Sequence, residues 1–209
     1  MVVLYVHGMG RTPLSGWPLM HRLRKSGIKT RSFFYISAFE EFDSIVKRLN
    51  DRIVKLAAVG PYVVIGHSLG GVLLRATLNA LPQGTALPKH VYLLGSPILS
   101  PRLAMKLKSN VLFRVFTGDC GQLLSSPERM ATIDALAVPT TGIAGVRGFA
   151  RSSEYFEGEE NDGFVSVNEA SATWFTELVR VQVMHTWLPS SGIVSDIIMH
   201  SLVENTSQG

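Results

Sequence analysis

Residues 63–74 carry the feature that most constrains how this chain can fold. A run of β-forming residues leads into Gly-His-Ser-Leu-Gly at 66–70, and a further glycine and a helical pattern of apolar residues follow. A Gly-x-Ser-x-Gly sequence between a strand and a helix is typical of a nucleophile elbow, whose serine occupies a strained backbone conformation. Side chains at 66 and 70 would collide with the neighbouring strand or helix, so both positions need glycine. The pattern predicts an exposed, nucleophilic Ser68, although an ordinary turn can have the same sequence pattern.

Apolar β-forming runs alternate with helical patterns along the whole chain. Strands are expected at 2–6, 29–35, 62–65, 90–94, 140–146 and 179–184, and helices at 14–26, 39–58, 72–80, about 166–175 and 193–203. Strands separated by helices favour crossover connections and therefore an α/β fold, with a mostly parallel central sheet and helices on both faces. A length of 209 residues suits one domain with a single substantial core.

The composition excludes several classes of protein. Hydrophobic residues make up 46% of the chain and charged residues 17%, which indicates a well-buried globular protein. The net charge is +4, but the basic residues are scattered and no nucleic-acid-binding motif accompanies them, so no nucleic-acid partner is expected. Cys120 is the only cysteine, which excludes an intrachain disulfide and a cysteine-rich metal site.

The first apolar run, at residues 2–6, is read as a core strand. It is short, lacks a basic leader and continues directly into His7-Gly8, unlike a secretory signal peptide. No apolar run approaches the length of a membrane span. We therefore expect a cytoplasmic protein without stable membrane insertion.

The segment 98–137 fits the alternation of strands and helices less well, because it contains no clear strand. One interpretation is an ordinary crossover of helices and loops. The other is a small cap over the mouth of the active site. Residues 111–113 and 115–116 are apolar on nearly all sides of a helix, as expected for a segment held between the core and a ligand.

The glycine-bearing sequence His7-Gly8-Met9-Gly10 follows the first expected strand. Such a loop can leave a backbone N–H free and pointing at the space above the elbow serine. Together with the N–H of Leu69, the residue after the serine, the Met9 N–H would form an oxyanion hole with two donors. His7 itself is expected to be structural and to steady this loop through hydrogen bonds.

A serine nucleophile needs a base and an acid, which should follow it in the order Ser, Asp or Glu, His. Of the histidines after the elbow, His90 opens a strand at the remote end of the sheet, and His200 lies on a late helix. His185 follows the expected strand 179–184, and the carboxyl ends of parallel strands line the catalytic crevice. We therefore expect His185 to be the base.

Asp162 is the expected acid. It lies in a polar loop with a glycine, after the strand 140–146, where its carboxylate could accept the Nδ1–H of His185 and fix the imidazole tautomer. Glu160 is the nearest competitor. Asp119 and Asp134 lie further from any expected strand end.

The order of these motifs resembles the α/β-hydrolase superfamily, and within it the small bacterial lipase and esterase branch. The motifs are His-Gly-Met-Gly at 7–10, Gly-His-Ser-Leu-Gly-Gly at 66–71, Leu-Gly-Ser-Pro at 94–97, Asn-Asp-Gly at 161–163 and Val-Met-His at 183–185. The resemblance implies the α/β-hydrolase fold and a Ser68–Asp162–His185 triad. It also implies Met9 and Leu69 as oxyanion donors, and catalysis without a metal or cofactor.

The function expected from these residues is hydrolysis of a carboxylic ester by a serine esterase or lipase through an acyl-enzyme intermediate. Apolar residues in 98–136 favour a small-molecule ester with an apolar acyl group. Thioesters would serve the same machinery, so an acyl thioesterase is the alternative within the enzyme class. A catalytically silent binding module on the same fold is the alternative from another class.

Overall fold

The computed structural model describes residues 1–149 and 155–207, with side chains up to residue 203. Its centre is a sheet in which all pairs of neighbouring strands are parallel, in the order β2-β1-β3-β4-β5-β6. The strands are β1 (Val2–Val6), β2 (Lys29–Phe33), β3 (Tyr62–His67), β4 (Val91–Leu94), β5 (Thr140–Gly145) and β6 (Glu177–Val181). The expected α/β architecture is confirmed.

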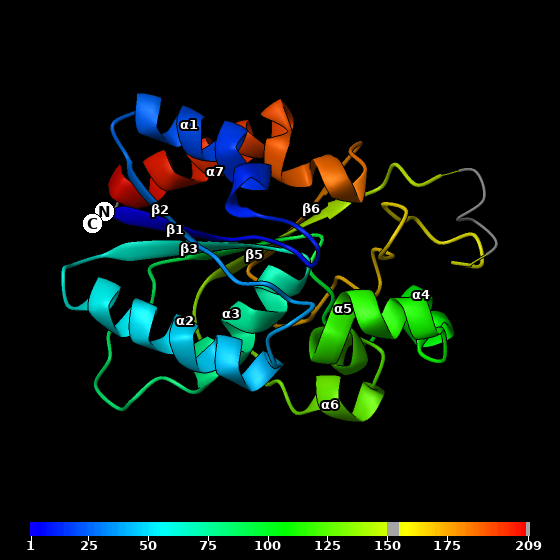
Figure 1. Ribbon diagram of the computed structural model, residues 1–209. Helices are drawn as coiled ribbons and strands as arrows, with labels where there is room; N and C mark the ends of the chain where they lie inside the picture. The colour runs from blue at the N-terminus through cyan, green and yellow to red at the C-terminus, as the bar shows by residue number, and fades with distance from the viewer. Residues whose placement is uncertain (150–154, 208–209) are drawn as a thin grey trace.

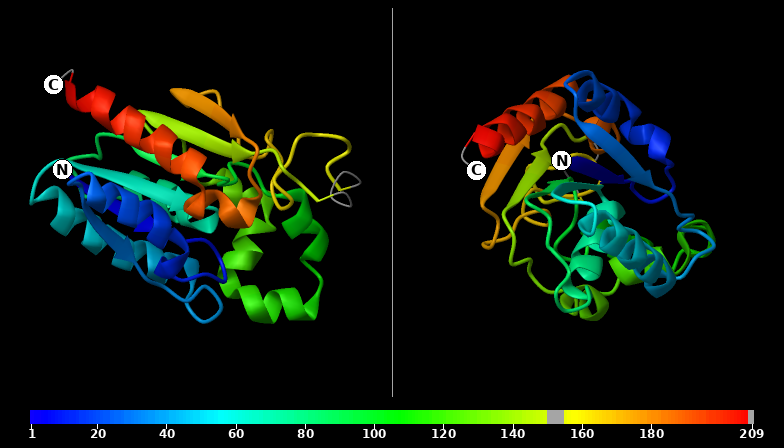
Figure 2. Two further views of the ribbon diagram at one scale, coloured as in Figure 1. Left: turned by 90° about the horizontal axis from the view of Figure 1, so that it is seen from above. Right: turned by 90° about the vertical axis from the view of Figure 1, so that its left-hand side faces the viewer.

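Helices cover both faces of the sheet, as Figures 1 and 2 show. α1 (Trp17–Lys25) and α7 (Gly192–Ser207) lie on one face, and α2 (Phe42–Ala57) and α3 (Leu69–Asn79) on the other. The core is divided accordingly. Leu4 and Val6 of β1 face the cluster beneath α2 and α3, whereas Val3 and Tyr5 face the cluster beneath α1 and α7. This alternation follows from the two-residue period of a strand that is buried on both faces.

The strand order creates a crevice at the carboxyl edge of the sheet. After β1 the chain crosses to β2 on one side, and after β2 it returns to β3 on the other side of β1. The loops that leave β1 and β3 therefore diverge, and such a switch point is where open α/β sheets bind ligands. Ser68 directly follows β3, and the 7–10 loop directly follows β1.

Residues 98–137 form three helices beyond this carboxyl edge, at the end of the molecule opposite the two termini (Figures 1 and 2). They are α4 (Arg102–Leu107), α5 (Val111–Leu124) and α6 (Pro127–Ala131). Gly118 interrupts α5 with a non-helical backbone at φ 58° and ψ −151°. Within the described ranges, no helix is long and apolar enough to cross a bilayer.

Two predicted elements differ from the structure. The last strand begins earlier than predicted and ends at Val181, because the chain bends where the Val183 N–H donates to the Val181 carbonyl at 2.7 Å. The helix expected at 166–175 is a series of turns. Its first turn forms, with Ala170 N–H donating to the Ser166 carbonyl. It does not continue, because Trp174 and Phe175 pack against the core cluster at the entry to β6.

Three buried histidines make the stability of this fold sensitive to mild acid. Burial lowers the pKa of His7, His67 and His90, so each imidazole favours the neutral form in the folded chain. The unfolded chain takes up protons on these imidazoles once the pH falls below about 6.5, and the folded chain resists doing so. The free energy of unfolding should therefore fall with pH, by at most about 1.4 kcal/mol per pH unit for each histidine.

Urea denaturation at about pH 7.5 and about pH 5.5, above the range in which most carboxylates titrate, measures this loss. His90→Gln should reduce the pH dependence, because glutamine can replace the 2.9 Å hydrogen bond from the His90 ring to the Thr141 hydroxyl without titrating. Equal urea midpoints at the two pH values in the parent protein would contradict the prediction.

Candidate active site

Ser68 occupies a tight turn between β3 and α3. Its backbone angles, φ 52° and ψ −124°, lie in a region that side chains with a Cβ rarely adopt. The turn is held by its surroundings, since the Ser68 N–H donates to the Leu94 carbonyl at 2.9 Å. A Cβ on Gly66 would lie 2.5 Å from the Gly71 Cα, and one on Gly70 would lie 2.2 Å from the Val6 carbonyl oxygen. The glycines of the motif are therefore required sterically, as the sequence predicts.

His185 and Asp162 form a buried hydrogen bond of 2.6 Å between Nδ1 and Oδ2. A carboxylate accepts hydrogen bonds, so Nδ1 carries the proton and Nε2 is left with a lone pair. The aspartate is fixed in turn, because its Oδ1 accepts from the Phe164 and Val165 N–H groups at 3.0 and 2.8 Å. The His185 N–H also donates to the Asp162 carbonyl at 3.0 Å. The structure thus joins the predicted base and acid.

The sequence analysis expected His185 to follow a strand directly, but the structure differs. β6 ends at Val181, and His185 begins a short 3-10 helix, His185–Ser190, at the same edge of the sheet. Glu160, the competing acid, lies on the surface, where it pairs with Arg180 at 3.2 Å. Asp119 pairs with Arg129 at 2.7 Å, far along the chain from the pair.

The loop that carries Asp162 is anchored to the start of α4. Arg102 binds this loop through its Nε, which donates to the Glu169 carboxylate at 3.0 Å, and its Nη2, which donates to Glu159 at 2.6 Å. The other Glu169 oxygen accepts the Ser166 N–H at 2.8 Å. Glu169 is only 5% exposed, and these partners replace the hydrogen bonds to water that burial removes.

Gly95, at the end of β4, lies against the His–Asp pair. Its φ is +53°, and a Cβ there would lie 2.9 Å from Asp162 Oδ2 and 3.0 Å from His185 Nδ1. The glycine therefore both permits the left-handed turn and leaves room for the hydrogen bond between the two side chains.

His67 is a site residue to which the sequence analysis assigned no role. It is buried directly before Ser68, and its Nε2 lies 3.0 Å from the carbonyl oxygen of His185. Because that partner only accepts, Nε2 must carry the proton. Burial, and after it the neighbouring His185, lower the pKa of His67 well below its ordinary value. No sequence pattern reveals this contact, since it joins residues 118 positions apart.

The loop after β1 lies beside the serine. A Cβ on Gly8 would lie 3.1 Å from the Ser68 Cβ. His7 is structural, as expected: its ring stacks on Tyr35 at 4.3 Å, and its carbonyl accepts the Tyr35 hydroxyl at 2.7 Å. Among the described residues, neither the Met9 nor the Leu69 N–H donates to another residue, so both can act as donors to a bound oxygen. Within the same residues, no three His, Cys, Asp or Glu side chains gather as a metal site would need.

Comparison with known proteins identifies the fold. Neither a protein-family model nor a curated protein matches the sequence. The mature lipase BlEst2 of Bacillus licheniformis matches in structure with a TM-score of 0.77 and 19% identity, over 96% of this chain and 91% of that one. The RedJ thioesterase of Streptomyces coelicolor matches with a TM-score of 0.65 and 14% identity, over 98% of this chain and 85% of that one. The chain has the α/β-hydrolase fold.

A third match is the phospholipase PlaB of Legionella pneumophila, with a TM-score of 0.66 and 20% identity over 82% of this chain and 45% of that one. The resemblance found in the motifs is thus matched by the course of the backbone. In an α/β-hydrolase fold, the strand-to-helix turn, a loop after an earlier strand and a late histidine meet at the carboxyl edge. Here the corresponding segments follow β3, β1 and β6.

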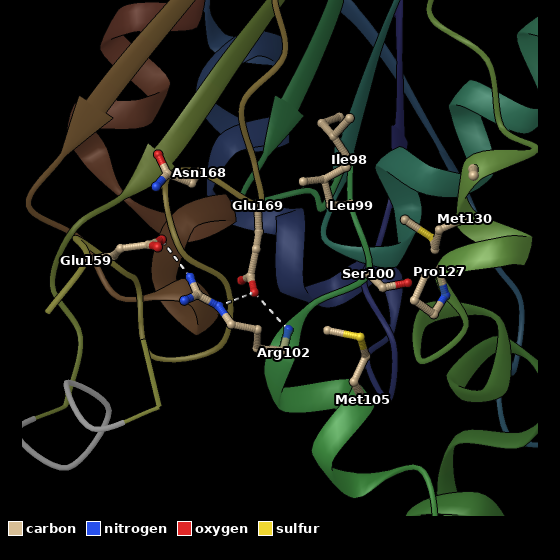
Figure 3. A pocket seen from close by; sticks show the side chains of 11 residues that line it. Ile98, Leu99, Ser100, Arg102, Met105, Pro127, Met130, Glu159, Asn168 and Glu169 are labelled. Atoms are coloured by element: carbon tan, nitrogen blue, oxygen red, sulfur yellow. Dashed lines mark hydrogen bonds and ion pairs between the residues drawn. The ribbon is translucent and has the colours of Figure 1, made fainter. Parts of the chain in front are cut away.

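A cavity of 470 Å³ opens at the same edge, between α4, α6 and the 159–169 segment (Figure 3). Its apolar wall is formed by Ile98, Leu99, Met105, Pro127, Met130 and Ala131. At the other side Figure 3 shows Arg102 between Glu159 and Glu169. Ser68 and His185 are not among its lining residues, whereas the loop that carries Asp162 contributes Glu159, Asn168 and Glu169.

Gly95→Ala should break the His185–Asp162 hydrogen bond without unfolding the chain. The left-handed backbone alone costs about 1–2 kcal/mol for a residue with a Cβ. The Cβ would also clash with the flexible end of the Leu188 side chain at 2.7 Å and with the two hydrogen-bonded atoms. We expect ¹H NMR of the parent protein to show a strongly deshielded Nδ1 proton of His185, and we expect this resonance to shift or disappear in the variant.

Gly84→Ala is the matched control. Gly84 also has a left-handed backbone, with φ +84°, but a Cβ there would meet no atom within 4 Å. It should lose similar stability and retain the proton resonance. An unchanged resonance in Gly95→Ala would show that the pair tolerates the side chain.

Proposed function

We propose that this protein is a serine hydrolase that cleaves carboxylic esters through an acyl-enzyme intermediate. The observation that carries the proposal is the buried His185–Asp162 hydrogen bond, which lies at the same sheet edge as the strained elbow serine. A lone serine hydroxyl is a poor nucleophile, and an oriented imidazole is the usual means of activating it. The lipase, phospholipase and thioesterase among the structural matches support the class.

In the first half-reaction His185 Nε2 accepts the Ser68 hydroxyl proton as the serine oxygen attacks the acyl carbon. The imidazolium that forms is stabilised by the Asp162 carboxylate, which two backbone N–H groups hold in place. The C–O bond to the alcohol then breaks, and the alcohol leaves with the proton from Nε2. The acyl group remains on Ser68.

Negative charge develops on the former carbonyl oxygen in both half-reactions. We assign its stabilisation to the free N–H groups of Met9 and Leu69, the latter at the positive N-terminal end of α3. In the second half-reaction His185 takes a proton from water, and the resulting hydroxide attacks the acyl carbon. Ser68 leaves with that proton, so that the carboxylic acid is released and the enzyme is restored.

An apolar acyl group is the substrate feature we favour. Apolar side chains dominate the cavity wall beside the site, and half-buried Met9 lies in the loop that would hold the oxyanion. A thioester would react by the same steps, and one structural match is a thioesterase. A catalytically silent binding module would not need an activated serine, so a fluorophosphonate probe, which labels only activated serines, separates the two classes.

Ser68→Ala and His185→Ala should each lower kcat for nitrophenyl esters by about 10⁴-fold or more, because the residues act as one unit and their losses do not add. Both proteins should stay folded, as measured by circular dichroism. The probe should label the parent protein and neither variant.

Asp162→Asn should also be strongly impaired, because an amide can hold the imidazole in the wrong tautomer. Glu160→Gln is the matched control and should keep full activity, since Glu160 pairs only with exposed Arg180. If Glu160→Gln were the damaging change, the assignment of the acid would be wrong. If Ser68→Ala retained ester turnover, the assignment of Ser68 as the nucleophile would be wrong.

His67 is expected to position the base. Its Nε2–H donates to the His185 backbone, so losing it frees the segment that presents the imidazole to Ser68. A misplacement of about 1 Å can cost up to about 100-fold in rate. His67→Leu should therefore lower kcat by roughly 10- to 100-fold with little change in KM. His67→Gln retains a donor near the same place and should recover most of the loss, whereas equal losses in both variants would point to packing alone.

A further inference from the structure

The first half of α5 exposes its apolar side chains to solvent. Residues 111–117 form about two turns of helix that begin at Asn110, whose side chain accepts the Phe113 N–H, and end at the Gly118 kink. Only Phe113 packs against the core. Val111, Leu112, Val115 and Phe116 are 63–69% exposed. The sequence analysis placed these residues between core and ligand, and the structure corrects that for all except Phe113.

Exposed apolar residues continue from α5 towards α4. Leu99 is 60% exposed and Met105 is 37% exposed. We define the α4–α5 apolar face as Leu99, Met105, Val111, Leu112, Val115 and Phe116. Single exposed apolar residues are ordinary on protein surfaces, but the four in α5 recur at helical spacing and share one side of the helix, and α4 contacts α5. Such a group of exposed apolar residues indicates a binding surface.

The charged residues around this face are all basic. Residues 98–118 contain Arg102, Lys106, Lys108 and Arg114, and no aspartate or glutamate. Arg102 is held by Glu159 and Glu169, and Lys106 lies over the Tyr155 ring at 4.3 Å. Lys108 and Arg114 are exposed beside the apolar residues. Basic residues flanking exposed apolar side chains on a helix are the signature of binding to an anionic lipid surface.

We propose that the α4–α5 apolar face docks this protein reversibly on anionic lipid bilayers. Its apolar side chains would enter the boundary between headgroups and acyl chains, while Lys108 and Arg114 would lie at the level of anionic phosphates. The attachment is peripheral, because the exposed helix is about two turns long and no described helix could span the bilayer.

A second copy of this chain is a poorer occupant of the face. A symmetric dimer brings the same patch of each subunit together. Here that would place two sets of basic residues opposite each other with no acidic residue in either segment 98–118 to compensate them. An anionic bilayer complements both the apolar and the charged part of the surface.

Docking through this face would bring the catalytic edge to the lipid. α4 and α5 lie beyond the carboxyl ends of the strands (Figures 1 and 2), and Ser68 follows the carboxyl end of β3. Arg102 fixes the start of α4 to the loop of Asp162. Leu99 and Met105 also line the cavity beside the site. That an ester would be delivered from the bilayer rests on the proposed function, whereas the docking itself does not.

The test is flotation of full-length protein with phosphatidylcholine vesicles, with and without phosphatidylglycerol, using Ser68→Ala so that hydrolysis cannot alter the lipid. We expect binding only to the anionic vesicles, weakening as salt is raised. Phe116→Ser combined with Leu112→Ser should reduce the fraction bound by at least about tenfold, and Lys108→Glu and Arg114→Glu by at least about fivefold each.

Matched controls are Val59→Ser and Lys29→Glu. Both residues are exposed at the opposite edge of the sheet, Val59 to 80%, and both variants should bind like the parent. Absence of binding, equal binding to neutral vesicles, or equal losses in the controls would overturn the proposal. So would a dimer in sedimentation experiments that dissociates in the Phe116 variant. Vesicle binding without any esterase activity in the parent protein would refute the proposed function and leave the docking intact.

Discussion

The carboxyl edge of this protein depends on the approach of α3 to β1. The Gly70 Cα lies so close to the Val6 carbonyl that any side chain would overlap it, and Gly66 and Gly71 meet in the same way across the turn. This approach places the N-terminal end of α3 directly above the strand that carries the 7–10 loop. Ser68 has no freedom to relax its positive φ, because the strand before it and the helix after it are both held. The strain at the serine is therefore sustained by packing of the whole central sheet.

A second constraint is the polar network that reaches from the base to α4. The Asp162 and Glu169 carboxylates lie in one loop, and the Arg102 guanidinium binds that loop. Each of the three groups has hydrogen-bond partners. Breaking a buried charged pair on one side costs much more than the pair contributes, since the remaining charge is stranded. The network therefore makes the position of the acid and the position of α4 interdependent, although 60 residues separate Arg102 from Asp162.

The sequence was most informative where one residue type alone satisfies a steric or chemical demand. The elbow glycines, the pairing of Asp162 with His185, and the period-two burial of the strands all belong to this class. Boundaries set by tertiary packing were less accessible. The end of β6 depends on a bend at 181–183. The helix predicted after Ser166 does not form because of where Trp174 and Phe175 pack against the core.

Contacts between distant residues that belong to no motif could not be predicted. Nothing local distinguishes His67 from any residue that precedes an elbow serine, since its partner is a backbone carbonyl. Glu160 and Asp162 are two positions apart in one polar loop, and only the bend of that loop turns Asp162 inward and leaves Glu160 with Arg180. Similarly, a helix that is apolar on all sides can be buried or exposed, and the pattern in 111–117 does not decide between them.

The exposed half of α5 has a physical consequence for how the carboxyl edge behaves. A helix of two turns is not stable in water by itself, because nucleation costs more than so few hydrogen bonds return. Residues 111–117 keep their shape through the Asn110 cap, the packing of Phe113 and the attachment of the following turns through buried Cys120, Leu123 and Leu124. Four of its large apolar side chains leave most of their surface in water and so contribute little to that stability. A surface that buries them gains the transfer free energy of the exposed part of these side chains, with little ordering cost to offset it. The α4–α5 apolar face thus has its binding conformation before a partner arrives. A partner bound there would lie at the same edge of the sheet as the candidate active site.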